Sequence, residues 1–232
     1  MSTIKTPVSR VKSGLVLAVL ATLGSASIPA AMQDPTLDPT TIPKYVTPLV
    51  IPPVMNNDGA SNSYDIAVRQ FKQQILPGGI WNTLNGRDDK FPATTVWSYG
   101  PAADPLPAGG VAPAADSQFN YPAYTVESLS NVPVDVRWIN DLVDAKGRYL
   151  PHLLSIDQTV HWANPVMECK DGSTRTDCAG TDPMPYDGPV PIVTHVHGAH
   201  VEGHSDGYPE AWWLPAAKNI PKKYATRGGA LR

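Results

Sequence analysis

Four of the six histidines of this 232-residue chain lie within one short segment, at His195, His197, His200 and His204. The run that contains the first two, from Gly188 to Gly198, is rich in β-branched residues and predicts a strand. Alternate residues of a strand project to one face, so His195 and His197 would present two imidazoles in the same direction. Because neutral imidazole binds Cu, Zn, Fe and Ni, the pattern predicts a metal site without selecting the metal.

The other two histidines of this segment follow the turn at Gly198 and are expected to face solvent. A third ligand could come from Glu202, five positions after His197. This arrangement is similar to the cupin pattern, in which a glutamate follows a His-x-His pair, and it would imply a small metalloenzyme. The glycines that flank the cupin pattern are not matched, since position 209 is a proline.

A longer part of the sequence resembles another family. The segments THVHG (194–198) and SDGYPEAW (205–212) resemble the first copper-binding segment of multicopper oxidases, particularly in the branch of spore-coat laccases and bilirubin oxidases. Upstream, LPHLLSIDQTVHWANP (150–165) and FNYPAYTVESLSNVPVDVRWINDL (119–142) resemble the segments that precede that site in the same branch. The likeness runs from about Tyr64 to Pro215 and is most specific from Leu150 onward.

The resemblance implies a cofactor, two substrates and roles for three residues. In multicopper oxidases, three cupredoxin-like domains hold four copper ions. A type 1 copper accepts electrons from a small reducing substrate, and a trinuclear cluster reduces O2 to water. By resemblance, His195 would bind the type 2 copper, His197 would bind a type 3 copper, and Asp206 would help to deliver protons. The expected partners are O2 and a phenol, pigment or metal ion that donates single electrons.

Two departures from the family pattern concern the copper ligands. The trinuclear cluster takes its ligands from four His-x-His pairs, whereas this sequence has one, and neither cysteine is flanked by histidine as a type 1 site requires. We therefore expect the chain to end within the first cupredoxin-like domain, with the second and third domains missing. It would be the amino-terminal part of a laccase-like oxidase or, alternatively, an inactive truncated remnant that binds copper weakly. Whether the chain alone is an enzyme stays open.

The composition favours short strands over long helices. Charged residues make up 17% of the chain, and 25 prolines and 18 glycines interrupt it, which is typical of all-β domains with many turns. Alternation of apolar and polar residues predicts strands at 64–69 and 134–140, residues 121–127 have strand-like composition, and 100–113 predicts a surface loop. With the resemblance, this predicts an all-β, cupredoxin-like Greek-key β-sandwich at residues 61–232, incomplete at its C-terminal end.

The N-terminal region has the three parts of a secretory signal peptide. Lys5, Arg10 and Lys12 precede an apolar run at 15–21, and small residues follow at 24–27. We expect residues 1–31 to direct export to the periplasm, cell surface or medium, with the cleavage point left open between positions 27 and 31. Residues 32–60 are rich in proline and predict an extended strap or, equally, a disordered spacer.

The cysteines and the net charge bear on compartment and partners. Cys169 and Cys178 bracket eight polar residues, and in an exported protein such a pair predicts a disulfide, with metal binding as the alternative. The net charge is −3 and no segment forms a basic stripe, so nucleic acid is not an expected partner. No apolar run has the roughly 20 residues that a membrane span needs.

Overall fold

The computed structural model describes residues 37–46, 51–56, 62–73, 75–76, 93–104, 117–159, 164–166 and 183–230. The chain divides into two compact units, Met1–Pro39 and Thr40–Arg232, and the sheet and the candidate site belong to the second. The predicted signal peptide, the two cysteines and His161 lie outside the described residues. In the part of the chain that is described, no helix has the length and apolar character needed to cross a membrane.

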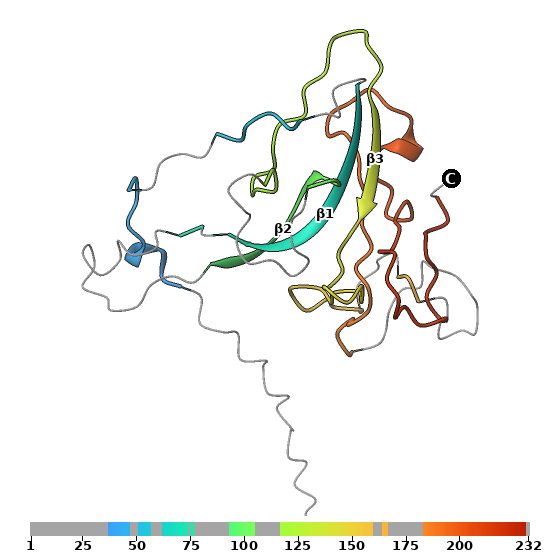
Figure 1. Cartoon of the computed structure of the whole chain (residues 1–232). Helices are drawn as coiled ribbons and strands as arrows, with labels where there is room; N and C mark the ends of the chain where they lie inside the picture. Colours follow the sequence, from blue (N-terminus) through green and yellow to red (C-terminus); the bar gives the residue numbers. More distant parts are fainter. Residues whose placement is uncertain are drawn as a thin grey trace, which may run out of the picture. The chain divides into compact units, whose positions relative to one another are not determined.

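A three-stranded sheet forms the regular part of the structure (Figure 1). β1 (Ser63–Gln73) lies in the centre, β2 (Thr94–Pro101) pairs with it antiparallel, and β3 (Asp135–Asn140) pairs with it parallel along its other edge. The helical elements among the described residues are two 3-10 turns, η1 (Pro39–Thr41) and η2 (Gly203–Ser205). This secondary structure confirms the predicted all-β class.

The apolar–polar alternation locates two of the three strands. The predicted strand at 64–69 lies within β1, and the one at 134–140 corresponds to β3. β2 is not predicted from the sequence, although the β-branched and aromatic residues of TTVWSY at 94–99 are typical of a strand. The predicted loop at 100–113 starts two residues early, because Gly100 and Pro101 still belong to β2. Glycine is needed at position 100, because a Cβ there would lie 2.9 Å from the ring of Phe119.

The strand expected at 121–127 is wrong. Within it only Thr125 forms a bridge, with Val54, and the remaining residues are irregular. Thr125 donates its amide hydrogen to the carbonyl oxygen of Pro53 at 2.9 Å, and its own carbonyl oxygen accepts from Met55 at 2.8 Å. Pro122 lacks an amide hydrogen, so a longer ladder cannot run through this segment.

The strand expected at 188–198 is also wrong. Only Ile192 forms a bridge, with Trp213, and the residues from 193 onward form a loop and a turn. Pro189 and Pro191 stand on either side of Val190 and remove two of the donors that a ladder would use. The backbone that carries the histidines therefore leaves the β-structure before it reaches them.

The side chains of β1 alternate between two apolar clusters, one on each face of the strand. On one face, Tyr64 and Ile66 of β1 pack with Met55. On the opposite face, Ala67 and Phe71 of β1 pack with Val96 of β2 and with Phe119. The centre of β1, at Ile66 and Ala67, is consequently inaccessible to solvent.

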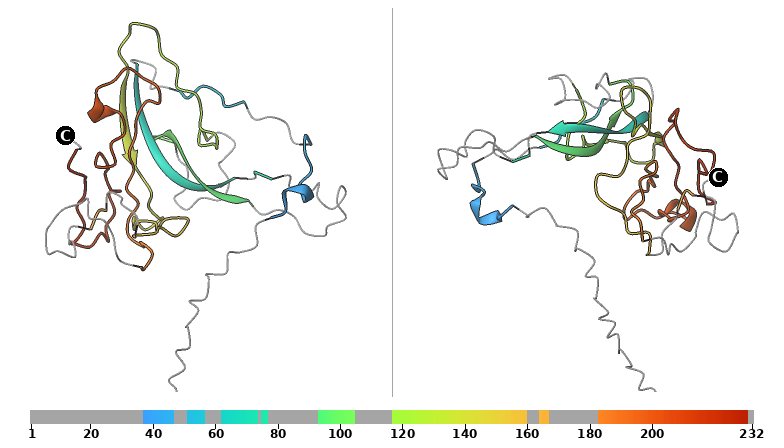
Figure 2. Two further views of the ribbon diagram at one scale, coloured as in Figure 1. Left: turned by 180° about the vertical axis from the view of Figure 1, so that it is seen from behind. Right: turned by 90° about the horizontal axis from the view of Figure 1, so that it is seen from below.

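Residues 183–230 lie beside β3, on the side away from β2, in each of the views of Figures 1 and 2. They contain a third apolar cluster, formed by Tyr186, Trp212, Leu214 and Tyr224. Asn140, the buried last residue of β3, donates from Nδ2 to the carbonyl oxygens of Val190 at 2.8 Å and Trp213 at 3.0 Å. These two bonds hold the backbone on both sides of the histidine segment.

Candidate metal centre

The backbone around His195 and His197 is fixed before and after the pair. Before it, Ile192 and Trp213 exchange two backbone hydrogen bonds of 3.2 Å. After it, Gly198 turns the chain with a φ of +77°, in the region that favours glycine. The histidine pair is therefore carried by a loop whose start is held against the third apolar cluster.

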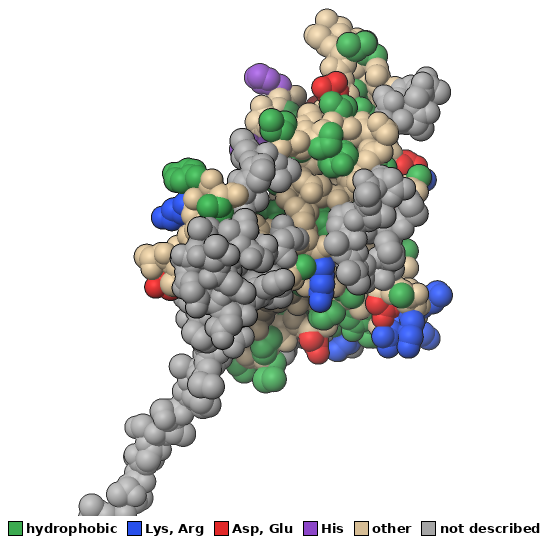
Figure 3. Space-filling model, turned by 60° about the vertical axis from the view of Figure 1, so that its left-hand side comes forward, with side chains coloured by type: hydrophobic (Ala, Val, Ile, Leu, Met, Phe, Trp, Pro, Cys, Tyr) green, Lys and Arg blue, Asp and Glu red, His purple; other side chains and the backbone are tan. Residues whose placement is uncertain are grey.

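The side chains of His195 and His197 lie against each other. Their ring centroids are 5.8 Å apart and their planes meet at 66°, which is an edge-to-face contact. Both residues are exposed, and histidine side chains are visible at the surface in Figure 3. The two imidazoles thus lie together, but on a loop rather than on the predicted strand.

Asp206 lies next to this pair because of the short turn η2. The amide of Ser205 donates to the carbonyl oxygen of Glu202 at 2.8 Å, and that of Asp206 donates to Gly203 at 3.2 Å. This turn brings Oδ1 of Asp206 to 3.8 Å from Nδ1 of His195. The separation exceeds a direct hydrogen bond, so the carboxylate lies beside the imidazole without bonding to it.

Gly207 contributes to the site, although the sequence alone assigns it no role. A Cβ at this position would lie 3.1 Å from Cγ and 3.3 Å from Nδ1 of His195, and its φ is +80°. The backbone of residue 207 therefore packs directly against the imidazole. The signal was present in the glycine of SDGYPEAW, whose conformational role only the structure shows.

The remaining candidate ligands do not join the pair. His200 is exposed as expected, and the side chain of His204 lies outside what is described. Glu202 is exposed and precedes η2. Among the described residues, no three His, Cys, Asp or Glu side chains are grouped so as to hold a metal ion. The cupin-like set of two histidines and Glu202 is thus not assembled in this structure.

His152 belongs to the packed interior rather than to the metal centre. Its ring lies between Trp97 and Tyr186, at centroid distances of 6.0 Å and 5.6 Å. Its Nε2 is buried and has no hydrogen-bond partner among the described residues. Burial lowers the pKa of His152 because the charged imidazolium loses hydration. Burial likewise raises the pKa of the Tyr186 hydroxyl, which donates to the carbonyl oxygen of Pro189 at 2.7 Å.

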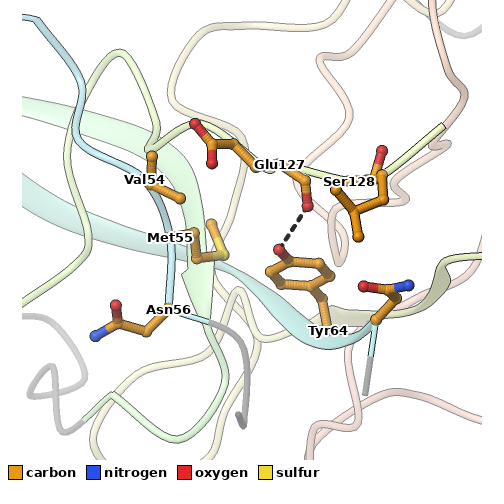
Figure 4. Close-up of a pocket in the computed structure, with 8 residues that line it drawn as sticks. Val54, Met55, Asn56, Tyr64, Glu127 and Ser128 are labelled. Carbon is orange, nitrogen blue, oxygen red and sulfur yellow. Dashed lines mark hydrogen bonds between the residues drawn. The ribbon is translucent and has the colours of Figure 1, made fainter. Parts of the chain in front are cut away.

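A pocket of about 340 Å³ lies elsewhere on the molecule and is separate from the histidines. Figure 4 shows Tyr64 pointing its hydroxyl to the carbonyl oxygen of Glu127, a hydrogen bond of 2.9 Å. The pocket is lined by Val54, Met55, Asn56, Asn62, Tyr64, Glu127, Ser128 and Leu129. Its lining offers one carboxylate and no imidazole or thiol, so it does not resemble a transition-metal site.

No protein-family model matches the chain. A laccase of Haloferax volcanii is 28% identical over 217 residues, which cover 91% of this chain. A laccase of Bacillus subtilis is 32% identical over 93 residues, or 40% of the chain, and the protein named Multicopper oxidase LPR1 homolog 3 of Oryza sativa is 33% identical over 93 residues. The chain is similar in sequence to multicopper oxidases.

The chain spans only part of the length of these relatives. It covers 28% of the Haloferax laccase, 14% of the Bacillus laccase and 12% of the rice protein. The names agree with the family resemblance carried by THVHG and SDGYPEAW. The predicted recognition is therefore confirmed at the level of the family.

The donor set of the candidate site fits copper chemically. Imidazole nitrogen is a ligand that copper accepts, and the structure offers two exposed imidazoles in contact at 5.8 Å. The carboxylate of Asp206 lies 3.8 Å from Nδ1 of His195, so an acidic group stands next to one of the two imidazoles. Two nitrogen ligands leave coordination positions to be filled from elsewhere.

Proposed function

We propose that this chain is part of a laccase-like oxidase in which His195 binds the type 2 copper and His197 binds a type 3 copper. The oxidase would remove single electrons from a phenol, a pigment or a metal ion and use them to reduce O2 to water. Copper, when bound, supplies both the one-electron transfer and the O2 chemistry. The observation that carries the proposal is the contact between two exposed imidazoles in a chain similar to laccases.

Asp206 is the residue of this chain that would assist the two proposed copper ligands. Oδ1 of Asp206 lies 3.8 Å from Nδ1 of His195, so its carboxylate stands beside the ring of one proposed ligand. The Asp206 side chain is 63% exposed, which lets it exchange protons with solvent. By resemblance to the oxidases, Asp206 would help to deliver the protons that the reduction of O2 to water consumes.

The remaining copper ligands would come from polypeptide that corresponds to the unmatched length of the relatives. Two features of the described residues support this. No third ligand stands with His195 and His197 in a group. Apolar side chains near the pair in sequence are also exposed, namely Val193, Val196, Val201 and Tyr208. Such a surface would be covered where a further domain brings its own ligands to the site.

The alternative is that the chain acts alone as a weak copper-binding protein without oxidase activity. The lack of a group of three ligands among the described residues favours this alternative over the cupin-like one. In either case we propose that the basic and apolar N-terminal region directs export. In the oxidising environment outside the cytoplasm, Cys169 and Cys178 would then form a disulfide.

Calorimetric titration of the chain with Cu(II) tests the proposal. His195→Ala and His197→Ala should each weaken copper binding by about tenfold or more, because each removes one of two nitrogen ligands. His200→Ala is the matched control, since His200 is an exposed histidine of the same segment, and it should leave the affinity unchanged.

Equal affinities for all four proteins would contradict the assignment of the ligands. Oxygen consumption separates the oxidase from the weak copper-binding alternative. Uptake of O2 by the copper-loaded chain alone, with a phenolic donor, would contradict the view that ligands come from further polypeptide. Uptake only when the corresponding domains of a longer protein are supplied would support it.

A further inference from the structure

A basic surface forms where two segments that are remote in the sequence meet. One segment is the turn at 144–149 and the other is the loop at 218–223. Together they expose five positively charged side chains, which we call the basic patch: Lys146, Arg148, Lys218, Lys222 and Lys223. Lys and Arg side chains gather in one region of the surface drawn in Figure 3, beside acidic ones.

Backbone and side-chain contacts hold the two segments together. The amide of Lys218 donates to the carbonyl oxygen of Gly147 at 2.9 Å, and the amide of Tyr149 donates to Oδ1 of Asn219 at 2.9 Å. The side chain of Lys218 lies over Gly147, with Cε 3.2 Å from where a Cβ of residue 147 would stand. Lys218 is therefore held against the turn that carries Lys146 and Arg148.

Two carboxylates stand near the basic patch, and one of them is engaged by the turn. Asp144 accepts from the amide of Arg148 at 2.9 Å and from its Nε at 2.8 Å. The amide and then the guanidinium of Arg148 lower the pKa of Asp144. The second carboxylate is Asp187. Burial raises the pKa of Tyr224, the charge of Asp187 adds to that rise, and the ring of Tyr224 lies under the ammonium group of Lys223. The five cations exceed these two carboxylates by three, in a chain whose net charge is −3.

We infer that the basic patch docks this protein on an anionic phospholipid surface. Four of its five members are lysines, whose flexible ammonium groups suit attraction to many phosphates rather than paired recognition of one. All five side chains are exposed, so each of them is accessible to a broad charged surface. Each lysine or arginine near such a surface contributes about fivefold to binding.

The test is co-sedimentation of the full chain with phosphatidylcholine vesicles that either contain or lack phosphatidylglycerol. We expect the chain to bind the phosphatidylglycerol vesicles more strongly, and the difference to shrink as salt is added. Lys218→Glu/Lys222→Glu should weaken that binding by about tenfold or more. Should glutamate disturb the fold, as judged by circular dichroism, Lys218→Gln/Lys222→Gln supplies the same test with a smaller charge change.

The matched control is Lys44→Glu/Lys72→Glu, which changes the net charge equally at two exposed lysines of other segments. It should retain the preference for phosphatidylglycerol. All variants share the basic and apolar N-terminal residues, so only differences between variants report on the patch. Equal binding by the two double variants would overturn the inference. Retention on heparin or DNA without binding to the vesicles would also overturn it, because the partner would then be another class of polyanion.

Discussion

The backbone of Gly207 packs closely against the imidazole of His195. A Cβ added at residue 207 would stand 3.1 Å from Cγ of the ring, which is closer than side chains normally approach. Gly198, on the other side of the histidine pair, has nearly the same φ, +77° against +80°, yet nothing lies within 4 Å of its Cβ position. The chain therefore offers two glycines with equal backbone demands, of which only one touches a candidate ligand.

This pair of glycines predicts a difference in copper affinity. Gly207→Ala and Gly198→Ala should each lower the free energy of unfolding by about 1 kcal/mol, because alanine is strained at positive φ. Only Gly207→Ala should also displace His195 and weaken Cu(II) binding, by about tenfold. Calorimetric titration measures the affinity and urea denaturation measures the stability. Equal copper affinities for the two variants would show that contact with Gly207 does not orient His195.

Asp206→Asn should weaken Cu(II) binding modestly. The substitution keeps the shape of the side chain but removes the negative charge that lies 3.8 Å from Nδ1 of His195. The carboxylate is exposed, and such pairs contribute about 0.2–1 kcal/mol, which corresponds to a loss of up to about fivefold in affinity. Glu202→Gln serves as the control and should have no effect. If Glu202→Gln abolished binding, the cupin-like alternative would be correct.

Arg69 should be a main electrostatic contribution to the stability of the sheet. Its guanidinium donates to Asp141 at 2.6 Å and to the carbonyl oxygens of Asp104 at 2.7 Å and Ala102 at 2.9 Å, and 16% of the side chain is exposed. Arg69→Met should lower the free energy of unfolding by about 2–3 kcal/mol, because these acceptors lose their donors.

A second arginine of the same sheet provides the comparison for Arg69. Arg137 on β3 pairs with Asp65, but 70% of its side chain is exposed. Arg137→Met should therefore change the free energy of unfolding by less than about 1 kcal/mol. Urea denaturation distinguishes the two variants. Similar losses in both would mean that the buried contacts of Arg69 add no stability beyond that of a surface ion pair.

The stability of the protein should fall as the solution becomes mildly acidic, in part because of His152. Burial lowers the pKa of His152 below its ordinary value of 6.5, so the unfolded chain binds a proton more readily than the folded one. This contribution to stability is complete above about pH 6.5 and is lost as the pH falls toward the lowered pKa. Asp144 and Asp157 have pKa values lowered from 3.8, so their losses come at lower pH.

Replacing the buried ring tests this pH dependence. His152→Phe keeps an aromatic ring between Trp97 and Tyr186 and removes the unpartnered Nε2. The variant should lose less stability than the parent chain between about pH 7 and pH 5.5. Melting temperatures at several pH values measure the difference. Parallel curves for the two proteins would show that His152 does not contribute to the acid sensitivity.

The sequence predicts those parts of the structure that depend on local pattern. β1 and β3 follow from apolar–polar alternation. The strand at 188–198 is mispredicted because the prediction relies on β-branched composition. In the structure, the missing amide donors of Pro189 and Pro191 prevent a ladder. The two imidazoles nevertheless come together, since the turn at Gly198 and the contact with Gly207 impose their placement.

Features that depend on remote contacts escape prediction. Asn140 links β3 to Val190 and Trp213 through bonds that join residues 50 and 73 positions apart. The basic patch likewise combines a turn and a loop that share no local pattern. Such contacts arise from packing of the whole chain, and no window of sequence contains both partners.

Electron paramagnetic resonance of the chain loaded with one equivalent of Cu(II) tests the central claim most directly. Nitrogen ligands split the copper signal, and imidazole is the ligand that this site offers. We predict nitrogen splitting in the parent chain and in His200→Ala, and its loss in His195→Ala/His197→Ala. An unchanged nitrogen pattern in that double variant would contradict the assignment of His195 and His197 as the copper ligands.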